Sequence, residues 1–177
     1  WIGSTSGRTA AACLDGRCGY IDLEGREIVP FSYDDAFLFC YGRGAVSKDG
    51  KWGYVDRNGR EVIGLSYDFA CNFLNGLAVV ILDGRYGLID TNGNVRIPIQ
   101  YDWAGALGED GTITVMKDGC FGFVDAKGNE IAPPIYDYAY DFNGGYAKVE
   151  LGGKTGYMDQ KGRLAVPAVY DDPDGDK

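Results

Sequence analysis

Histidine is absent from the 177 residues of the chain. Catalysis by Ser-His-Asp or Cys-His groups, zinc ligation by imidazole and histidine-based pH switching are therefore excluded. Positive charge is also scarce, because 17 Lys and Arg stand against 26 Asp and Glu, giving a net charge of −9. Nucleic acids and anionic membrane surfaces attract basic patches, so this balance argues against both as partners. The longest apolar run, Leu77 to Leu82, is far shorter than a membrane span, so no membrane insertion is expected.

A sustained helical period is missing as well. The sequence holds 28 Gly and 6 Pro, which interrupt it too often for helices of ordinary length. Hydrophobic residues make up 45% of the chain, which is enough to build a core and excludes a disordered protein. The length is that of one domain, and we take residues 1–177 as a single domain built from many short elements.

Internal repetition is the strongest feature of the sequence. Five segments align with one another: DGRCGYID, DGKWGYVD, DGRYGLID, DGCFGFVD and GGKTGYMD. Their shared glycines are Gly19, Gly53, Gly87, Gly122 and Gly156, at spacings of 34, 34, 35 and 34 residues. A Tyr-Asp pair follows each glycine at the same spacings, so the one extra residue falls in the loop Gly108–Gly111. The repeat cores lie near residues 15–34, 49–68, 83–102, 118–137 and 152–171.

Each repeat is predicted to consist of β-strands joined by tight turns. Asp-Gly or Gly-Gly at the start of each segment predicts a two-residue type I′ hairpin turn. Four-residue turns that end in glycine, such as Asp56 to Gly59, come next. The fold class is therefore all-β, with three strands per repeat and a short fourth strand left open. A glycine inside a strand indicates close approach of another group, for which we expect an aromatic ring of the neighbouring repeat at Gly87.

The segment DGKWGYVD, followed by a glycine turn, a proline and Tyr-Asp-x-Ala, resembles the WG-containing (KWG) repeat family. The resemblance covers roughly residues 8 to 172, although only Trp52-Gly53 shows the literal Trp-Gly pair. The family is mainly bacterial and has no catalytic motif. The resemblance therefore implies a binding or interaction module.

Two architectures fit five such repeats. A β-propeller-like ring would start near Thr9, in the second strand of a blade that Tyr170-Asp171 completes. Trp1-Ile2 could fill the missing piece at this seam. The alternative is an open β-solenoid or superhelix, for which 34 residues per three strands is comfortable. The ring is the preferred prediction.

Acidic residues recur at fixed turn positions. An Asp that opens a turn usually accepts a hydrogen bond from the backbone two residues on. Repetition at one position favours this structural role over calcium binding or acid catalysis, and Asp34-Asp35 and Asp171-Asp172 are interpreted in the same way. No catalytic residue, metal site or cofactor is predicted, and the protein is expected not to be an enzyme. The turn residues concerned are Asp22, Asp56, Asp90, Asp125 and Asp159.

Aromatic residues occupy two repeated positions. Trp52, Tyr86 and Phe121 share one, and stacked rings of this kind are usually core. The position after Tyr-Asp holds Phe69, Trp103 and Tyr138 but also Asp35 and Asp172, and a buried site does not accept an unpaired acid. We expect these three rings to form one exposed stripe beside the lengthened loop. The candidate binding residues are Phe69, Trp103, Tyr138, Glu109 and Asp110.

The favoured function is a non-enzymatic scaffold that binds a protein or peptide partner, within a larger protein. The alternative is a lectin-like module that stacks sugars of a glycan on the three rings. A carboxylate-based hydrolase is a third hypothesis, which no constellation of residues supports.

Cysteine usage bears on the compartment. Five cysteines, an odd number without metal-ligand spacing, and no visible signal peptide favour a cytoplasmic protein. The hairpin register nevertheless places Cys13 opposite Cys18, so a labile bridge between them on oxidation is expected, with free thiols under reducing conditions.

Overall fold

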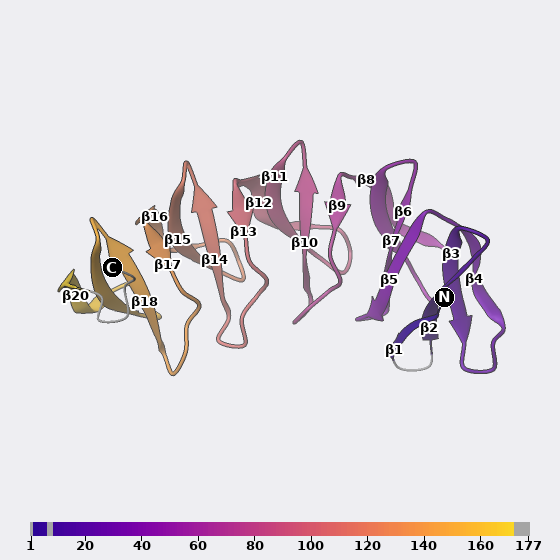
Figure 1. Ribbon diagram of the computed structural model, residues 1–177, viewed down its shortest axis with the longest axis horizontal. Coiled ribbons are helices and arrows are strands. Elements are labelled where there is room, and N and C mark those ends of the chain that lie inside the picture. The colour runs from indigo at the N-terminus through magenta and orange to yellow at the C-terminus, as the bar shows by residue number, and fades with distance from the viewer. Residues whose placement is uncertain (1, 7–8, 172–177) are drawn as a thin grey trace. The chain divides into compact units, whose positions relative to one another are not determined.

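The computed structural model describes residues 2–6 and 9–171, with side chains from Thr9 onward. Every strand in this part of the chain belongs to one of five four-stranded sheets, and no helix occurs there (Figure 1). The all-β prediction with five tandem repeats is confirmed.

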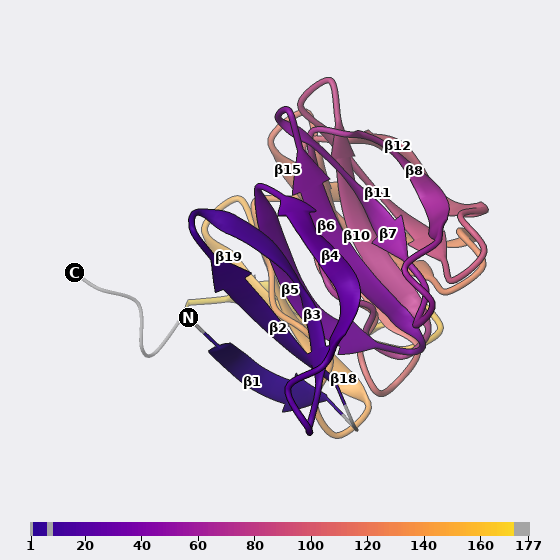
Figure 2. The same cartoon turned by 90° about the vertical axis from the view of Figure 1, so that its right-hand side faces the viewer.

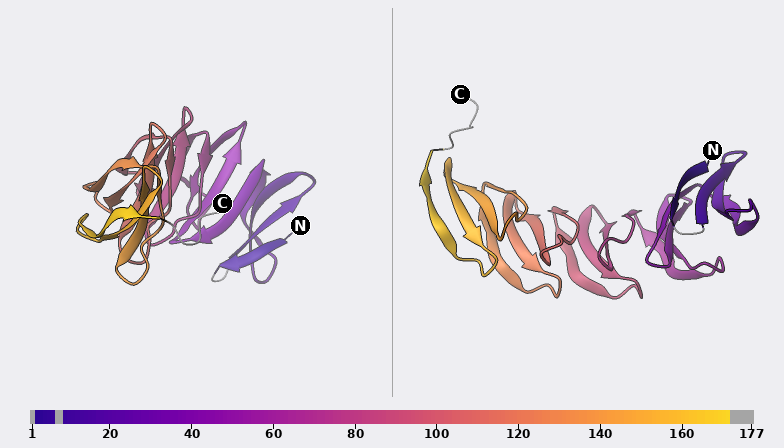
Figure 3. Two further views of the ribbon diagram at one scale, coloured as in Figure 1. Left: turned by 60° about the vertical axis from the view of Figure 1, so that its left-hand side comes forward. Right: turned by 90° about the horizontal axis from the view of Figure 1, so that it is seen from below.

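The strands of each sheet follow one another in chain order, as a meander that can be traced in Figure 3. The first sheet contains β1 (Ile2–Ser6), β2 (Thr9–Leu14), β3 (Arg17–Asp22) and β4 (Glu27–Tyr33). The second contains β5 (Asp35–Cys40), β6 (Arg43–Lys48), β7 (Lys51–Val55) and β8 (Glu61–Tyr67). The third contains β9 (Phe69–Ala70), β10 (Leu77–Leu82), β11 (Arg85–Asp90) and β12 (Val95–Tyr101). The fourth contains β13 (Trp103–Ala104), β14 (Thr112–Lys117), β15 (Cys120–Asp125) and β16 (Glu130–Tyr136). The fifth contains β17 (Tyr138–Ala139), β18 (Tyr146–Leu151), β19 (Lys154–Asp159) and β20 (Leu164–Tyr170).

The short fourth strand therefore exists, and it follows the Tyr-Asp pair. The Tyr ends one sheet, the Asp forms a bend, and the next residue begins the following sheet. Thr9 begins the second strand of the first sheet and Ile2 belongs to its first strand, as expected, but Tyr170 does not complete that sheet, because β20 belongs to the fifth. Trp1 lies outside the described residues.

The chain divides into two compact units, each described by itself below. The first unit contains residues 1–84 and 88–95, and the second contains residues 85–87 and 96–177.

The hairpin turns have the predicted geometry. At the second repeat Lys48 pairs with Lys51, and the two residues between them, Asp49 and Gly50, have φ of 52° and 75°. Such left-handed values at both positions define the type I′ turn that suits the strand twist. The same pair of positive φ values recurs at Asp15-Gly16, Asp83-Gly84, Asp118-Gly119 and Gly152-Gly153.

The four-residue turns are closed by their aspartates. The carboxylate of Asp56 accepts the backbone N–H of Asn58 at 2.8 Å and that of Arg60 at 3.0 Å. These hydrogen bonds hold the pKa of Asp56 below its usual value, and the one from the Arg60 N–H has the largest effect. Equivalent bonds confirm the structural role at Asp22, Asp90, Asp125 and Asp159.

The strand glycines face backbone, not the expected aromatic ring. A Cβ added to Gly53 would lie 2.5 Å from the carbonyl oxygen of Ile63 and 2.7 Å from that of Gly64, both on the adjacent strand β8. The pairing of β7 with β8 is irregular between Trp52 and Tyr54, which brings the two backbones together at the glycine. At Gly87 the nearest atoms likewise belong to Ile97 and Ile99 of β12.

Facing sheets bury their apolar residues against each other. In the first unit, the first sheet faces the second, with β2 beside β5 (Figure 2). Tyr20 and Val29 of the first sheet pack on Phe39 and Val46 of the second. The Tyr20 hydroxyl crosses this interface and donates to the carbonyl oxygens of Phe37 and Ala45, at 2.7 and 2.9 Å. The burial of the hydroxyl raises the pKa of Tyr20.

In the second unit, the fourth and fifth sheets pack in the same way. Phe123 and Ala132 of the fourth sheet contact Val149 and Met158 of the fifth. The other face of the fifth sheet is uncovered, with Tyr157 45% exposed, Val166 37% and Tyr170 59%. The corresponding residues of the second sheet are buried: Tyr54, Ile63 and Tyr67.

Candidate functional site

A groove between the fourth and fifth sheets gathers aromatic side chains. Its volume is about 470 Å³, and both of its walls belong to the second unit. We call it the aromatic groove. It is lined by Asp102, Trp103, Thr114, Met116, Phe121, Tyr138, Ala139, Tyr140 and Asp141.

The floor of the aromatic groove follows from cross-strand pairing. Trp103 on β13 is paired with Met116 on β14, and Met116 is paired with Phe121 on β15. The three side chains therefore project from the same face of the fourth sheet. The Phe121 ring lies 6.4 Å from that of Trp103 and 5.0 Å from that of Tyr138, on the fifth sheet.

Three of the rings are open to solvent. Trp103 is 39% exposed, Tyr138 46% and Tyr140 44%, and the last two rings lie 4.8 Å apart. Single exposed aromatic residues are normal, but a cluster lining a hollow marks an interaction surface. Lys148 lies over the Tyr140 ring, 5.0 Å from its centre, and its ammonium is 3.6 Å from the carboxylate of Glu150.

The first unit contains a matching row of rings, but there the hollow is filled. Phe37 lies 4.6 Å from the Trp52 ring and 5.9 Å from the Phe69 ring, and Trp52 is only 8% exposed. Phe37 stands three residues after Asp34. The residue three after Asp102 is Gly105, which has no side chain to cover the floor. The aromatic groove is thus open where the equivalent space in the first unit is packed.

A second hollow, of about 350 Å³, adjoins the first, and we call it the acidic groove. Asp141 lines both. Its carboxylate accepts the hydroxyl of Thr114 at 2.7 Å. Asp110 closes its own turn by accepting the N–H and hydroxyl of Thr112, at 3.1 and 2.9 Å. The acidic groove is lined by Ala106, Gly108, Glu109, Asp110, Thr112, Asp141, Phe142, Asn143 and Gly144.

Comparison of the sequence with known families matches nearly the whole chain. The model of the WG-containing repeat matches residues 19–52, 52–86, 86–119, 121–154 and 156–172. The chain belongs to this family.

Several solved structures are similar to this chain in fold. Kluyveromyces lactis Hsv2p superposes with a TM-score of 0.51 at 13% identity, over 90% of this chain and 61% of that one. A KlHsv2 with loop 6CD replaced by a Gly-Ser linker gives 0.50 at 11% identity, over 86% and 61%. The chain thus spans about three-fifths of the length of these structures. At such identities the similarity concerns the fold alone. No curated protein matches the chain.

The aspartate of the Tyr-Asp pair connects neighbouring WG repeats through an ion pair and a hydrogen bond. Asp34 forms an ion pair with Arg17 of its own repeat, and it accepts the N–H of Asp49 in the next hairpin turn at 2.7 Å. Asp102 makes the same two contacts, with Arg85 and Asp118. This uniform position is therefore scaffold, as expected for Asp34. Of the pair Asp171-Asp172, Asp172 lies outside the described residues.

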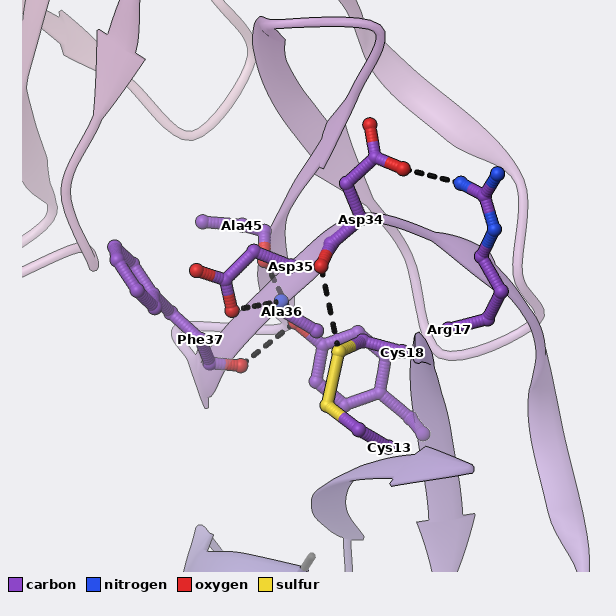
Figure 4. Close-up of a disulfide and its surroundings, with 9 residues drawn as sticks. Cys13, Arg17, Cys18, Asp34, Asp35, Ala36, Phe37 and Ala45 are labelled. Atoms are coloured by element: carbon purple, nitrogen blue, oxygen red, sulfur yellow. Dashed lines mark hydrogen bonds and ion pairs between the residues drawn. A yellow bond between two sulfur atoms is a disulfide. The ribbon is translucent and has the colours of Figure 1, made fainter. Parts of the chain in front are cut away.

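One disulfide joins β2 and β3 of the first sheet (Figure 4). Cys13 and Cys18 are cross-strand partners with Cα atoms 4.0 Å apart, which confirms the predicted register. The Cys18 sulfur also contacts the Asp34 carbonyl oxygen at 3.6 Å. Cys40, Cys71 and Cys120 are thiols, so the cytoplasmic expectation, which counted five thiols, now rests on three.

The predicted binding residues fall in three places. Trp103 and Tyr138 line the aromatic groove, and Glu109 and Asp110 line the acidic groove beside it. Phe69 belongs to the filled row of the first unit, where it lies 5.1 Å from Trp52.

Sequence reasoning missed Tyr140 and Asp141, which stand three and four residues after Asp137 of the Tyr-Asp pair. An alignment of the repeats would have shown that these two positions vary. It also placed Phe121 in the core. The ring is half-buried and forms the floor of the aromatic groove.

Within the described residues, no group of three or more acids or cysteines is arranged to hold a metal ion. No helix there is long and apolar enough to cross a membrane.

Proposed function

We propose that this protein is a non-enzymatic WG-repeat scaffold that binds a peptide segment of a protein partner in the aromatic groove. One observation carries the proposal. Trp103, Tyr138 and Tyr140 line an open groove, whereas the equivalent row in the first unit is packed against Phe37. Exposed aromatic residues are the usual anchors of binding hot spots, because they bury a large area with few rotatable bonds.

The test compares the wild type with Trp103→Ala and Tyr138→Ala in partner capture followed by quantitative binding. Both variants are expected to melt close to the wild type, since Trp103 and Tyr138 are each more than a third exposed, and to lose the partner. Leu164→Ala, another exposed apolar residue of the second unit, is the control. Unchanged binding by both groove variants would contradict the proposal.

A glycan-binding module is the second candidate. The combination of flat rings with the Asp141 carboxylate and the Thr114 hydroxyl favours it, because sugars stack on aromatic faces and donate hydroxyls to carboxylates. Titration with a glycan panel distinguishes the two candidates.

We further propose that the sheets close as a ring rather than an open solenoid. The support comes from the fifth sheet, whose Tyr157, Val166 and Tyr170 are exposed at positions that other sheets bury. A compact chain of this length has a radius of gyration of about 16 Å. Small-angle scattering that gives a clearly larger value for the monomer would contradict the ring.

A further inference from the structure

Negative charge is concentrated where the two grooves meet. The aromatic groove carries Asp102 and Asp141, and the acidic groove carries Glu109, Asp110 and again Asp141. No lysine or arginine is among the lining residues of either hollow.

The acids differ in how far they are already neutralised. Asp102 is paired with Arg85, whereas Asp110, of the acidic groove, accepts hydrogen bonds only from the neutral Thr112. In the described part of the chain, Asp141 has no basic partner and bonds only the neutral Thr114 hydroxyl. A ligand in the aromatic groove thus meets a carboxylate whose charge is not balanced.

Aromatic faces beside a carboxylate form a recognisable site for an organic cation. The face of a ring attracts a cation through its quadrupole, and a long basic side chain covers apolar surface with its methylene stem. The protein uses this contact internally, since Lys148 lies over the Tyr140 ring.

We infer that the bound segment inserts an arginine side chain into the aromatic groove, with its guanidinium directed at Asp141. Arginine fits better than lysine, because its planar head both stacks on rings and donates two parallel hydrogen bonds to a carboxylate. The adjoining acidic groove, with exposed Glu109, suits a second basic residue of the same segment. This inference rests on the proposed function and specifies the chemistry of its ligand.

The experiment uses two synthetic pentapeptides, acetyl-Ala-Leu-Arg-Leu-Ala-amide and the same peptide with citrulline in place of arginine. Citrulline has nearly the same shape but no charge. Binding is followed by NMR through the indole N–H of Trp103, with the signal of Trp52 as an internal reference. The arginine peptide is expected to shift the Trp103 signal and to bind about tenfold more tightly than the citrulline peptide.

Three variants locate the effect. Asp141→Asn should weaken the arginine peptide about tenfold while leaving the citrulline peptide unchanged. Gly105→Phe adds a ring at the position that Phe37 holds in the second sheet. Because a Cβ there would lie 3.2 Å from the Trp103 ring, the variant must also displace that wall of the groove, and it should block both peptides. Glu27→Gln removes one exposed charge of the first unit and should change neither, which separates local recognition from the overall charge of −9.

The outcomes distinguish the inference from the proposed function. Equal binding of both peptides at Trp103 refutes the arginine inference and leaves the proposed function standing. A shift of Trp103 by a glycan and by neither peptide overturns both in favour of the glycan-binding module. If none of these probes shifts the Trp103 signal, both are contradicted.

Discussion

Gly53 and Gly64 are neighbours on paired strands, but the same substitution should destabilise the protein only at Gly53. In Gly53→Ala the new methyl group would lie 2.5 Å from the carbonyl oxygen of Ile63 and 2.8 Å from the carbonyl carbon of Gly64. Both are backbone atoms, so relief requires the two strands to separate and their pairing to weaken. In Gly64→Ala the methyl group meets nothing within 4 Å.

The magnitude follows from the cost of overpacking a well-packed site, about 1–3 kcal/mol. Because backbone atoms cannot rotate away as a side chain can, we expect Gly53→Ala near the top of that range, about 3 kcal/mol. At roughly 2–4 °C per kcal/mol for a chain of this size, the melting temperature should fall by about 6–12 °C. Gly64→Ala should stay within about 0.5 kcal/mol of the wild type.

Thermal unfolding followed by circular dichroism measures both variants under identical conditions. A Gly53→Ala variant that melts together with Gly64→Ala would refute the close approach of the two backbones.

The remaining predictions concern thiols, pH and a buried hydroxyl. Denatured, non-reduced protein should titrate three thiols, and five after reduction; five without reduction would contradict the Cys13–Cys18 disulfide. The pKa values of Asp22, Asp56, Asp125 and Asp159 are lowered in the folded protein, so their stabilising effect is present above the unfolded pKa and is lost as pH falls through the folded pKa. The melting temperature should therefore drop as the pH falls below about 4, and less so in a variant with Asn at all four positions. Tyr54→Phe removes a 2.6 Å hydrogen bond to the Cys71 carbonyl oxygen and should cost about 1 kcal/mol in chemical denaturation; a variant as stable as the wild type would show that the bond contributes nothing.

Much of the fold could be predicted from the sequence because local chemistry determines it. The Asp-Gly pairs specify type I′ turns, and the turn aspartates specify their own hydrogen bonds. The extra residue was placed correctly in the loop Gly108–Gly111. There the Gly111 N–H donates to the Gly108 carbonyl oxygen, and the turn is wider than the equivalent two-residue turn of the preceding repeat, Asn75-Gly76.

The rest depended on contacts between elements. The irregular register at Gly53 has no local signal, so the approaching group was misidentified as an aromatic ring. The open groove depends on a difference between repeats, Phe37 in one and Gly105 in another, rather than on any motif. Phe121 and Trp52 share a repeat position, yet only Trp52 is buried, because the covering ring is present in one case and missing in the other.

The central claim is that the aromatic groove binds a partner while the ring row of the first unit is structural. The most direct measurement is a pairwise comparison of Trp103→Ala with Phe69→Ala, recording melting temperature and affinity for the arginine peptide in the same preparations. We expect Trp103→Ala to keep its melting temperature and lose binding, and Phe69→Ala to lose about 2 kcal/mol of stability and keep binding. The reverse pattern, or loss of stability in both variants with binding unaffected, would contradict the account.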